Sequence, residues 1–275
     1  MAGIPTITLN DGVTIPQLGF GVFQVPDADT QAAVATALEA GYRSIDTAAV
    51  YGNEAGVGRA IAASGLLRDE VFVTTKLWVS DLGRTRARDA LRRSLDKLGL
   101  DRVDLYLIHW PAPATDAYLE AWQTLEELQA EKLTRAIGVS NFLPEHLDRV
   151  AALGGTVPAV NQIELHPALQ NRETVAANQA HGIATEAWSP FAQGAVLGEP
   201  AVVAAAGAHG VTPAQVVLRW HLQQGRIVIP KSVTPSRIAA NLDVFGFELS
   251  TEELAAIDAL ENDGRTGPHP ARYNG

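Results

Sequence analysis

The sequence lacks cysteine entirely: none of its 275 residues is Cys. This absence excludes a disulfide framework and a thiolate metal site, and makes a reducing compartment the default. The sequence also lacks any uninterrupted apolar run near the roughly 20 residues that a membrane helix needs. Its first residues, MAGIPTITLND, have neither the basic flank nor the apolar core of a signal peptide. We therefore expect a soluble, cytoplasmic protein with no membrane partner.

Positive charge is scarce. Lys and Arg together number 21 against 31 Asp and Glu, which gives a formal net charge of −10. Contact with a phosphate backbone needs clustered Lys and Arg, so we expect no nucleic-acid partner. A small phosphate-bearing ligand would have to be met by a local basic cluster.

A third absence concerns glycine spacing. The chain has no GxGxxG, the fingerprint that an open doubly wound sheet is expected to carry after its first strand, and GNEAGVG at 52–58 has the wrong spacing. What the chain has instead is a regular alternation of short β-like runs and amphipathic helical runs. The predicted strands lie near residues 18–21, 43–46, 71–76, 103–109, 135–139, 159–164, 183–188 and 226–230. The predicted helices between them cover residues 30–40, 54–63, 86–97, 117–130, 144–152, 173–181 and 213–223.

About eight such units in a chain of this length predict an α/β protein with a closed (β/α)₈ TIM barrel, and an open doubly wound sheet is the competing fold. Two segments lie outside the alternation. Alternating runs flank Asn10-Asp11-Gly12 and predict an N-terminal β-hairpin that closes the bottom of the barrel. A short helix from about residue 235, a helix over 251–260 and an irregular tail follow the last strand. No linker or repeat is visible, so we expect one domain over 1–275, and a monomer.

Four polar residues stand at or just beyond the carboxyl ends of successive predicted strands, where barrel enzymes place their chemistry. They are Asp46, Tyr51, Lys76 and His109. Singly, each is more often a solvated rim charge or a structural histidine. Together they make chemical sense. Lys76 would lower the pKa of the Tyr51 phenol, Asp46 would keep Lys76 charged, and a neutral His109 would orient a carbonyl oxygen that Tyr51 protonates.

At this point a family resemblance becomes clear. The matching stretches are GFGVFQVP (19–26), GYRSIDTAAVYGNE (41–54), VFVTTKLW (71–78), DLYLIHWP (104–111), IGVSNF (137–142), VNQIELHP (160–167), IPKSV (229–233) and DGRTGPHP (263–270). The chain resembles the aldo-keto reductase superfamily, and within it the bacterial reductases similar to 2,5-diketo-D-gluconate reductase. The resemblance implies an NADPH-dependent oxidoreductase that reduces aldehydes, ketones or keto acids to alcohols. Tyr51 would be the general acid, with Asp46, Lys76 and His109 as its partners.

The resemblance also implies where the cofactor binds. Ser140, Asn141 and Gln162 would hold the nicotinamide carboxamide, and Trp188 would stack on the nicotinamide ring. Taken alone, Ser140-Asn141 would be read as a helix cap and Trp188 as core packing. Ser189 and the loop Phe191–Leu197, which includes Gln193, would face the pyrophosphate.

A basic cluster follows the last predicted strand, with Thr234 as a helix N-cap and Pro235 as the first helical residue. Its cations and hydroxyls at a helix start suit a phosphomonoester. By family likeness it would bind the adenosine 2′-phosphate, with Asn241 near the adenine. The alternative is a solvated basic cap. The cofactor residues expected here are Lys231, Ser232, Val233, Thr234, Arg237 and Asn241.

Substrate selection should lie with apolar groups around the barrel mouth, and these favour small organic carbonyl compounds. The expected residues are Phe20, Val22, Phe23, Trp78, His109 and Trp110, with the tail around Tyr273.

Two other functions stay open. A metal-dependent barrel hydrolase would use Asp46, His109, Glu164 and His166 as ligands, but that pattern is incomplete and leaves Lys76 and Tyr51 unexplained. A nucleotide-sensing barrel with little turnover would bind NADPH without needing a substrate. We expect no metal.

Overall fold

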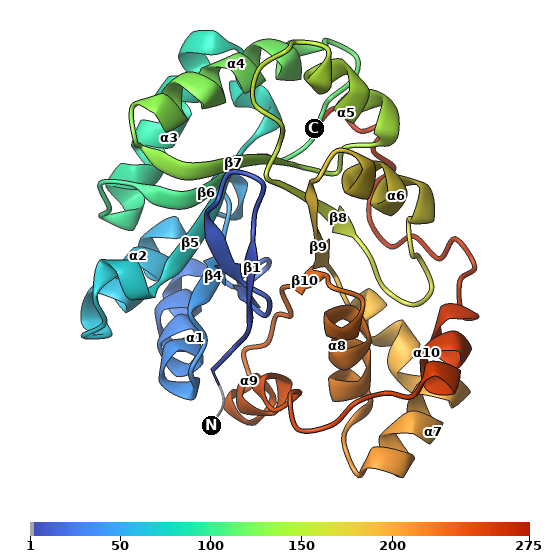
Figure 1. The fold of residues 1–275 in the computed structure, drawn as a ribbon. Coiled ribbons are helices and arrows are strands. Elements are labelled where there is room, and N and C mark those ends of the chain that lie inside the picture. Colours follow the sequence, from blue (N-terminus) through green and yellow to red (C-terminus); the bar gives the residue numbers. More distant parts are fainter. Residues whose placement is uncertain (1–2) are drawn as a thin grey trace.

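The computed structural model describes residues 3–275. Eight strands form one parallel sheet in the order β10-β9-β8-β7-β6-β5-β4-β3, and the helices surround it (Figure 1). The strands of this sheet are β3 (Phe20–Gly21), β4 (Ser44–Asp46), β5 (Phe72–Leu77), β6 (Val103–Ile108), β7 (Thr134–Ser140), β8 (Val160–Glu164), β9 (Ala184–Trp188) and β10 (Ile227–Val228). Each lies within two residues of its predicted position.

The sheet closes on itself between its first and last strands. Leu18 forms a parallel bridge with Val228. Backbone N–H groups of Gly19 and Gly21 donate to the carbonyls of Val228 and Pro230, at 2.9 and 3.1 Å. The predicted (β/α)₈ barrel is therefore confirmed, and the open sheet is excluded.

The helices largely follow the prediction. They are α1 (Asp27–Ala40), α2 (Glu54–Ala63), α3 (Arg84–Leu98), α4 (Ala117–Ala130), α5 (Pro144–Ala151), α6 (Arg172–Ala180), α7 (Pro200–His209), α8 (Pro213–Gln223), α9 (Pro235–Leu242) and α10 (Thr251–Asp258). Short 3₁₀ segments are η1 (Ala49–Tyr51), η2 (Arg68–Glu70), η3 (Val79–Asp81) and η4 (Ala192–Gly198). Helix α7 is not predicted by the sequence pattern. Its run AVVAAAGAH is apolar all round, so it lacks the one-sided pattern from which a helix is recognised.

The N-terminal hairpin covers the amino ends of the barrel strands, as predicted. β1 (Thr6–Thr8) pairs antiparallel with β2 (Thr14–Pro16). Leu9 and Ile15 from the hairpin belong to a small apolar cluster whose other members come from the barrel strands. The amide of Asn10 donates to the Pro158 carbonyl at 3.0 Å. This cap leaves the carboxyl ends of the strands as the open mouth.

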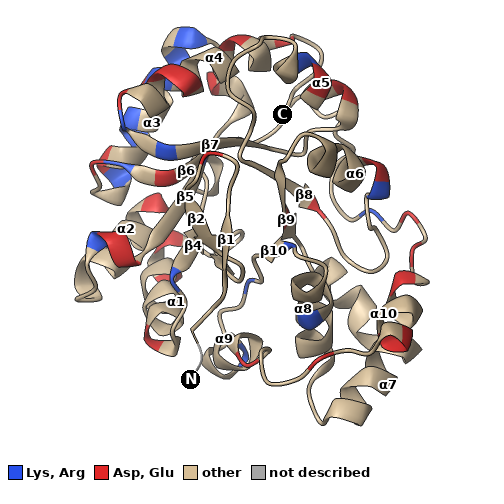
Figure 2. Cartoon of the chain, in the orientation of Figure 1, with Lys and Arg blue, Asp and Glu red and all other residues tan. Residues whose placement is uncertain are grey.

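The surface carries interspersed charges. Figure 2 shows basic and acidic residues close together on α3 and α4, and several pair there, such as Arg88 with Glu127 and Glu131. Among residues 3–275 no single helix is long and apolar enough to cross a membrane. The pair α7 and α8 reaches the required length only when counted together, and the chain bends by 94° between them.

Candidate active site

The four predicted catalytic residues meet at the barrel mouth. Asp46 ends β4, Lys76 lies in β5, His109 follows β6 directly, and Tyr51 ends the 3₁₀ turn η1. Asp46 pairs in register with Gly21 of β3, where an added Cβ would lie 3.3 Å from the Ile229 carbonyl oxygen. The carboxyl ends of neighbouring parallel strands thus bring these groups together, as the sequence predicts.

Lys76 is the centre of the group. Its ammonium donates to Asp46 Oδ1 at 2.6 Å, to the Thr47 carbonyl at 2.9 Å and to the Tyr51 hydroxyl at 3.4 Å. The side chain of Lys76 is 0% exposed and that of Asp46 is 4% exposed. Burial works to lower the pKa of Lys76, but the charge and hydrogen bond of Asp46, with Tyr51, outweigh it and raise that pKa. Lys76 is therefore a permanent cation beside the phenol.

The pKa of Tyr51 departs from the expectation. Burial among neighbouring groups raises it, and the opposing attraction of Lys76 does not reverse the shift in the chain alone. The predicted lowering of this pKa is therefore wrong. The consequence is that Tyr51 keeps its proton and is available as a hydrogen-bond donor.

His109 lies against Tyr51 and Trp78, with ring centroids 5.6 and 5.2 Å away in edge-on arrangements. Burial, and then the charge of Lys76, hold the pKa of His109 well below its ordinary value, so the ring is neutral as predicted. Its Nδ1 is buried without a hydrogen-bond partner in residues 3–275. Nε2 is the ring nitrogen left for a substrate oxygen.

The turn that carries Tyr51 is fixed by a buried network that the sequence analysis did not identify. Thr47 Oγ1 donates to Asn53 Oδ1 at 2.8 Å, and Asn53 Nδ2 donates to the carbonyls of Val22 and Val25, each at 2.9 Å. Gly52 adopts φ 69°, a left-handed conformation that glycine takes without strain. Asn53 therefore ties the Tyr51 turn to the loop after β3.

The expected carboxamide residues lie side by side at the ends of β7 and β8. Ser140 pairs in register with Gln162, and its hydroxyl donates to the Gln162 carbonyl at 2.8 Å. Asn141 donates to the His109 carbonyl at 2.9 Å and accepts from the indole N–H of Trp188 at 2.9 Å. The half-buried Trp188 ring is thus fixed beside these polar groups, an arrangement that fits a flat amide-bearing ring.

Glu186 is a buried acid that the sequence analysis missed. Gln162 Nε2 donates to Glu186 Oε2 at 2.9 Å and to Asp46 Oδ2 at 2.8 Å. Burial, then the charge of Asp46, raise the pKa of Glu186 to about 7. The sequence does contain a signal for this residue. Glu186 stands two residues before Trp188 in one strand, and alternate strand residues share a face, so Glu186 should face the same site as Trp188.

The segment after β9 was expected to be a loop facing a pyrophosphate. The structure shows a kinked pair of 3₁₀ turns, η4, instead. Ser189, Ala192 and Gln193 have φ of 54°, 47° and 56°. Such conformations are uncommon outside glycine and cluster at ligand-binding positions. Gln193 is exposed on this segment.

The predicted phosphate cluster lies where β10 leads into α9. Lys231, Val233, Thr234 and Arg237 are exposed, and neither cation forms an ion pair anywhere in 3–275. Thr234 is the N-cap by position, but its side chain makes no capping bond; its backbone N–H donates to the Ser232 hydroxyl oxygen at 3.1 Å. Unpaired cations at a helix start fit a phosphate group. Asn241 is buried on α9.

The structure corrects part of the predicted substrate wall. Phe20 pairs in register with Ile45, points out of the barrel and packs against Tyr42 at 5.6 Å. Val22 is 0% exposed in the main core. These two predictions are wrong, because the alternation of β3 turns Phe20 away from the mouth. Phe23, at 56% exposed, lies 5.0 Å from Tyr51.

The remaining wall is aromatic and includes the end of the chain. Tyr273 lies 4.6 Å from Trp110 and 6.3 Å from Trp78, measured between ring centroids. The tail therefore reaches the mouth, as predicted.

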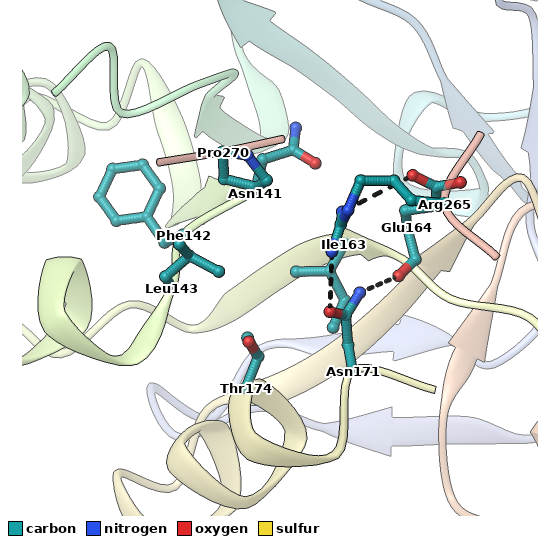
Figure 3. Close-up of a pocket in the computed structure, with 9 residues that line it drawn as sticks. All are labelled: Asn141, Phe142, Leu143, Ile163, Glu164, Asn171, Thr174, Arg265 and Pro270. Atoms are coloured by element: carbon teal, nitrogen blue, oxygen red, sulfur yellow. Dashed lines mark hydrogen bonds and ion pairs between the residues drawn. The ribbon is translucent and has the colours of Figure 1, made fainter. Parts of the chain in front are cut away.

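Glu164 anchors that tail. Its carboxylate accepts from the Thr266 N–H and hydroxyl, both at 2.6 Å, and from the Gly267 N–H at 3.1 Å. Figure 3 shows Arg265 reaching towards Glu164 and Asn171 beside a pocket that Pro270 and Asn141 also line. His166 bonds to Glu164 at 3.2 Å. The supposed metal ligands therefore form two separate groups, and no set of three or more such side chains in the described chain could hold an ion.

Comparison with known proteins decides the family. The model of the Aldo/keto reductase family matches residues 17–201 and 198–262. The chain belongs to this family. The resemblance seen in the sequence is thereby confirmed.

Several relatives match this chain along its whole length. An aldo-keto reductase of Mycolicibacterium vanbaalenii is 55% identical over 274 residues, covering 100% of this chain and 98% of that protein. The methylglyoxal reductase DkgA of Escherichia coli is 51% identical over 277 residues, covering 100% of each. Among solved aldo/keto reductases, a Gox0644 variant in complex with NADPH superposes with a TM-score of 0.94 at 45% identity, covering 98% of both chains. A Bombyx mori aldo-keto reductase in complex with NADP superposes with a TM-score of 0.89 at 40% sequence identity, covering 96% of this chain and 95% of that one.

Proposed function

We propose that this aldo/keto reductase uses NADPH to reduce the carbonyl group of a small aldehyde, ketone or keto acid to an alcohol, as an oxidoreductase acting on CH–OH groups. The observation that carries the proposal is the buried contact of Lys76 with both Asp46 and Tyr51 at the barrel mouth. The NADPH complex of a 45% identical relative and the methylglyoxal reductase among the relatives support it.

The residues present fit the cofactor at both of its ends. Ser140, Asn141 and Gln162 are the groups that would hold the nicotinamide carboxamide, with Trp188 against the ring. Lys231 and Arg237 are exposed cations for the 2′-phosphate, with Ser232 beside them. Bound NADPH supplies a hydride to the carbonyl carbon.

The chain's own residues manage the oxygen of the substrate. His109 Nε2 would orient the carbonyl oxygen, and Tyr51 would donate its proton to that oxygen as negative charge develops there. The phenolate left behind lies 3.4 Å from the Lys76 ammonium, which stabilises it. Asp46 keeps Lys76 charged through the whole step.

The substrate would lie against an aromatic wall of Phe23, Trp78 and Trp110, closed by Tyr273. We further propose that the chain is a monomeric, cytoplasmic, single-domain enzyme. One continuous barrel sheet and a core shared by all its helices support the single domain.

The test is a panel of aldehydes, ketones and keto acids assayed by loss of NADPH absorbance. We expect turnover with several of them, unchanged by a metal chelator. NADPH binding without turnover of any compound would contradict the reductase proposal and favour a nucleotide-sensing role. Stoichiometric zinc required for activity would contradict it as well.

A further inference from the structure

Gln162 connects two buried carboxylates beneath the proposed nicotinamide site. Its amide nitrogen donates one hydrogen to Asp46 Oδ2 at 2.8 Å and the other to Glu186 Oε2 at 2.9 Å. An ionised carboxylate only accepts, so the two acids fix which way round the amide lies. The side-chain amide oxygen of Gln162, Oε1, forms no hydrogen bond with residues 3–275, and it is not among their buried unpartnered atoms. It is therefore left to accept from a ligand.

Glu186 is the less explained of these two acids. It is 1% exposed and pairs in register with Gln162 of β8 on one side and Ile227 of β10 on the other. The titratable groups that face it across the barrel are Asp46 from β4, Lys76 from β5 and Tyr51 from η1. One ammonium thus stands against two carboxyl groups, and Asp46 already takes its shortest contact.

We propose that Glu186 is a positioning residue for this reaction: together with Asp46 it fixes the Gln162 side-chain amide so that Gln162 Oε1 accepts from the nicotinamide carboxamide, and its charge favours the oxidised over the reduced cofactor. This inference rests on the proposed function. Glu186 acts through Gln162 and through its electrostatic field.

The two cofactor forms differ in the charge of the nicotinamide ring. The oxidised nicotinamide ring is a cation and the reduced ring is neutral, so a carboxylate on the Trp188 face of β9 attracts only the oxidised form. Burial and the charge of Asp46 raise the pKa of Glu186 to about 7. The preference should therefore appear as Glu186 ionises across neutral pH. The pKa of His109 lies well below its ordinary value, so that ring stays neutral across the same range.

The experiment measures the dissociation constants of NADP⁺ and NADPH at pH 6 and pH 8 by quenching of tryptophan fluorescence. For the wild type, we expect the preference for NADP⁺ over NADPH to rise several-fold from pH 6 to pH 8. The 2′-phosphate titrates in both forms and cancels in this ratio. Glu186→Gln should remove the pH dependence and weaken NADP⁺ about tenfold at pH 8 relative to NADPH. Any misorientation of Gln162 in this variant should weaken the binding of both NADP⁺ and NADPH, so its effect also cancels in the ratio of the two dissociation constants.

The matched control is Glu54→Gln. Glu54 is also 1% exposed, but its carboxylate accepts from Thr75 at 2.7 Å on the outer face of the barrel wall and pairs with Lys97. This variant should keep the wild-type preference at pH 8. If the wild type prefers NADP⁺ over NADPH to the same degree at pH 6 and pH 8, the inference is overturned. This measurement needs only the wild type, so it decides the question even if Glu186→Gln does not fold. Failure of the wild type to bind either form would instead overturn the proposed function, and this inference with it.

Discussion

Lys76 and Asp46 form an ion pair of 2.6 Å in which neither side chain is more than 4% exposed. A pair so deeply buried costs desolvation energy on both sides, and we infer that its charges are retained in this protein because they have a use. Here the use is the third contact of Lys76, to the hydroxyl of Tyr51.

Changing Tyr51 to Phe should abolish carbonyl reduction. The variant keeps the ring that contacts Phe23 and His109 and removes only the hydroxyl that donates the proton. We expect kcat to fall by about 10²–10⁴-fold, the range for loss of a general acid. NADPH binding, followed by fluorescence quenching, should stay within twofold of wild type. Substantial remaining turnover would refute the acid role.

Changing Asp46 to Asn should destabilise the fold as well as the reaction. It leaves the Lys76 ammonium buried without its carboxylate, and breaking such a pair costs about 3–5 kcal/mol of unfolding free energy. Urea denaturation measures the loss. The control is Asp27→Asn, which breaks an ion pair with Arg59 whose side chains are 48% and 39% exposed, and should cost less than about 1 kcal/mol. Equal losses in the two variants would contradict this view.

Neutralising Lys231 and Arg237 together should weaken NADPH far more than NADH. Only NADPH carries the 2′-phosphate, and each cation at such a site contributes through charge-assisted hydrogen bonds of about 1.5–3 kcal/mol. Dissociation constants for both nucleotides would be compared. The control is Arg84→Gln on α3, an exposed arginine paired with Glu127 far along the chain from this cluster. Equal weakening of NADPH and NADH would show that the cluster does not recognise the phosphate.

Glu186 should make the fold less stable as pH rises from 4.5 to about 7. Its pKa in the folded chain is raised from 4.5 to about 7, so the folded chain holds this proton more tightly than the unfolded chain does. The stabilisation that Glu186 gives to the folded chain is therefore full below pH 4.5, and it is lost as pH rises towards 7. Glu186→Gln should therefore gain stability relative to wild type between pH 5 and pH 8, by on the order of a few kcal/mol. Urea denaturation measures the unfolding free energy of both proteins at each pH. If the wild type and Glu186→Gln show the same dependence on pH, the raised pKa is contradicted.

The barrel and its catalytic group could be predicted because both follow from local patterns. Strand and helix periods fix the eight β/α units, and Asp46, Lys76 and His109 are recognisable as strand-end residues. Helix α7 could not be predicted, because an alanine-rich apolar segment has no polar face from which a helical period can be recognised.

The errors at the site arise from orientation and environment, which the sequence specifies less directly. Phe20 and Phe23 are both aromatic residues of the segment around β3, but only the register with β4 shows that Phe20 points outward. The pKa of Tyr51 depends on how deeply its hydroxyl is buried, and the neighbouring charge alone suggested the opposite direction. Glu186 matters through Gln162, a contact between two strands that no local pattern reports.

The bridge between Leu18 and Val228 has a consequence for synthesis on the ribosome. β3 has only β4 as a strand partner until residue 228 emerges, so its other edge stays open while most of the chain is made. An open strand edge is a site of unwanted pairing, and long-range closure is slow. β3 is two residues long, and Gly19 and Gly21 leave this edge poor in side chains, which we expect to limit its pairing with other nascent chains. We therefore expect the residues that close the finished barrel to protect it from such pairing while it is incomplete.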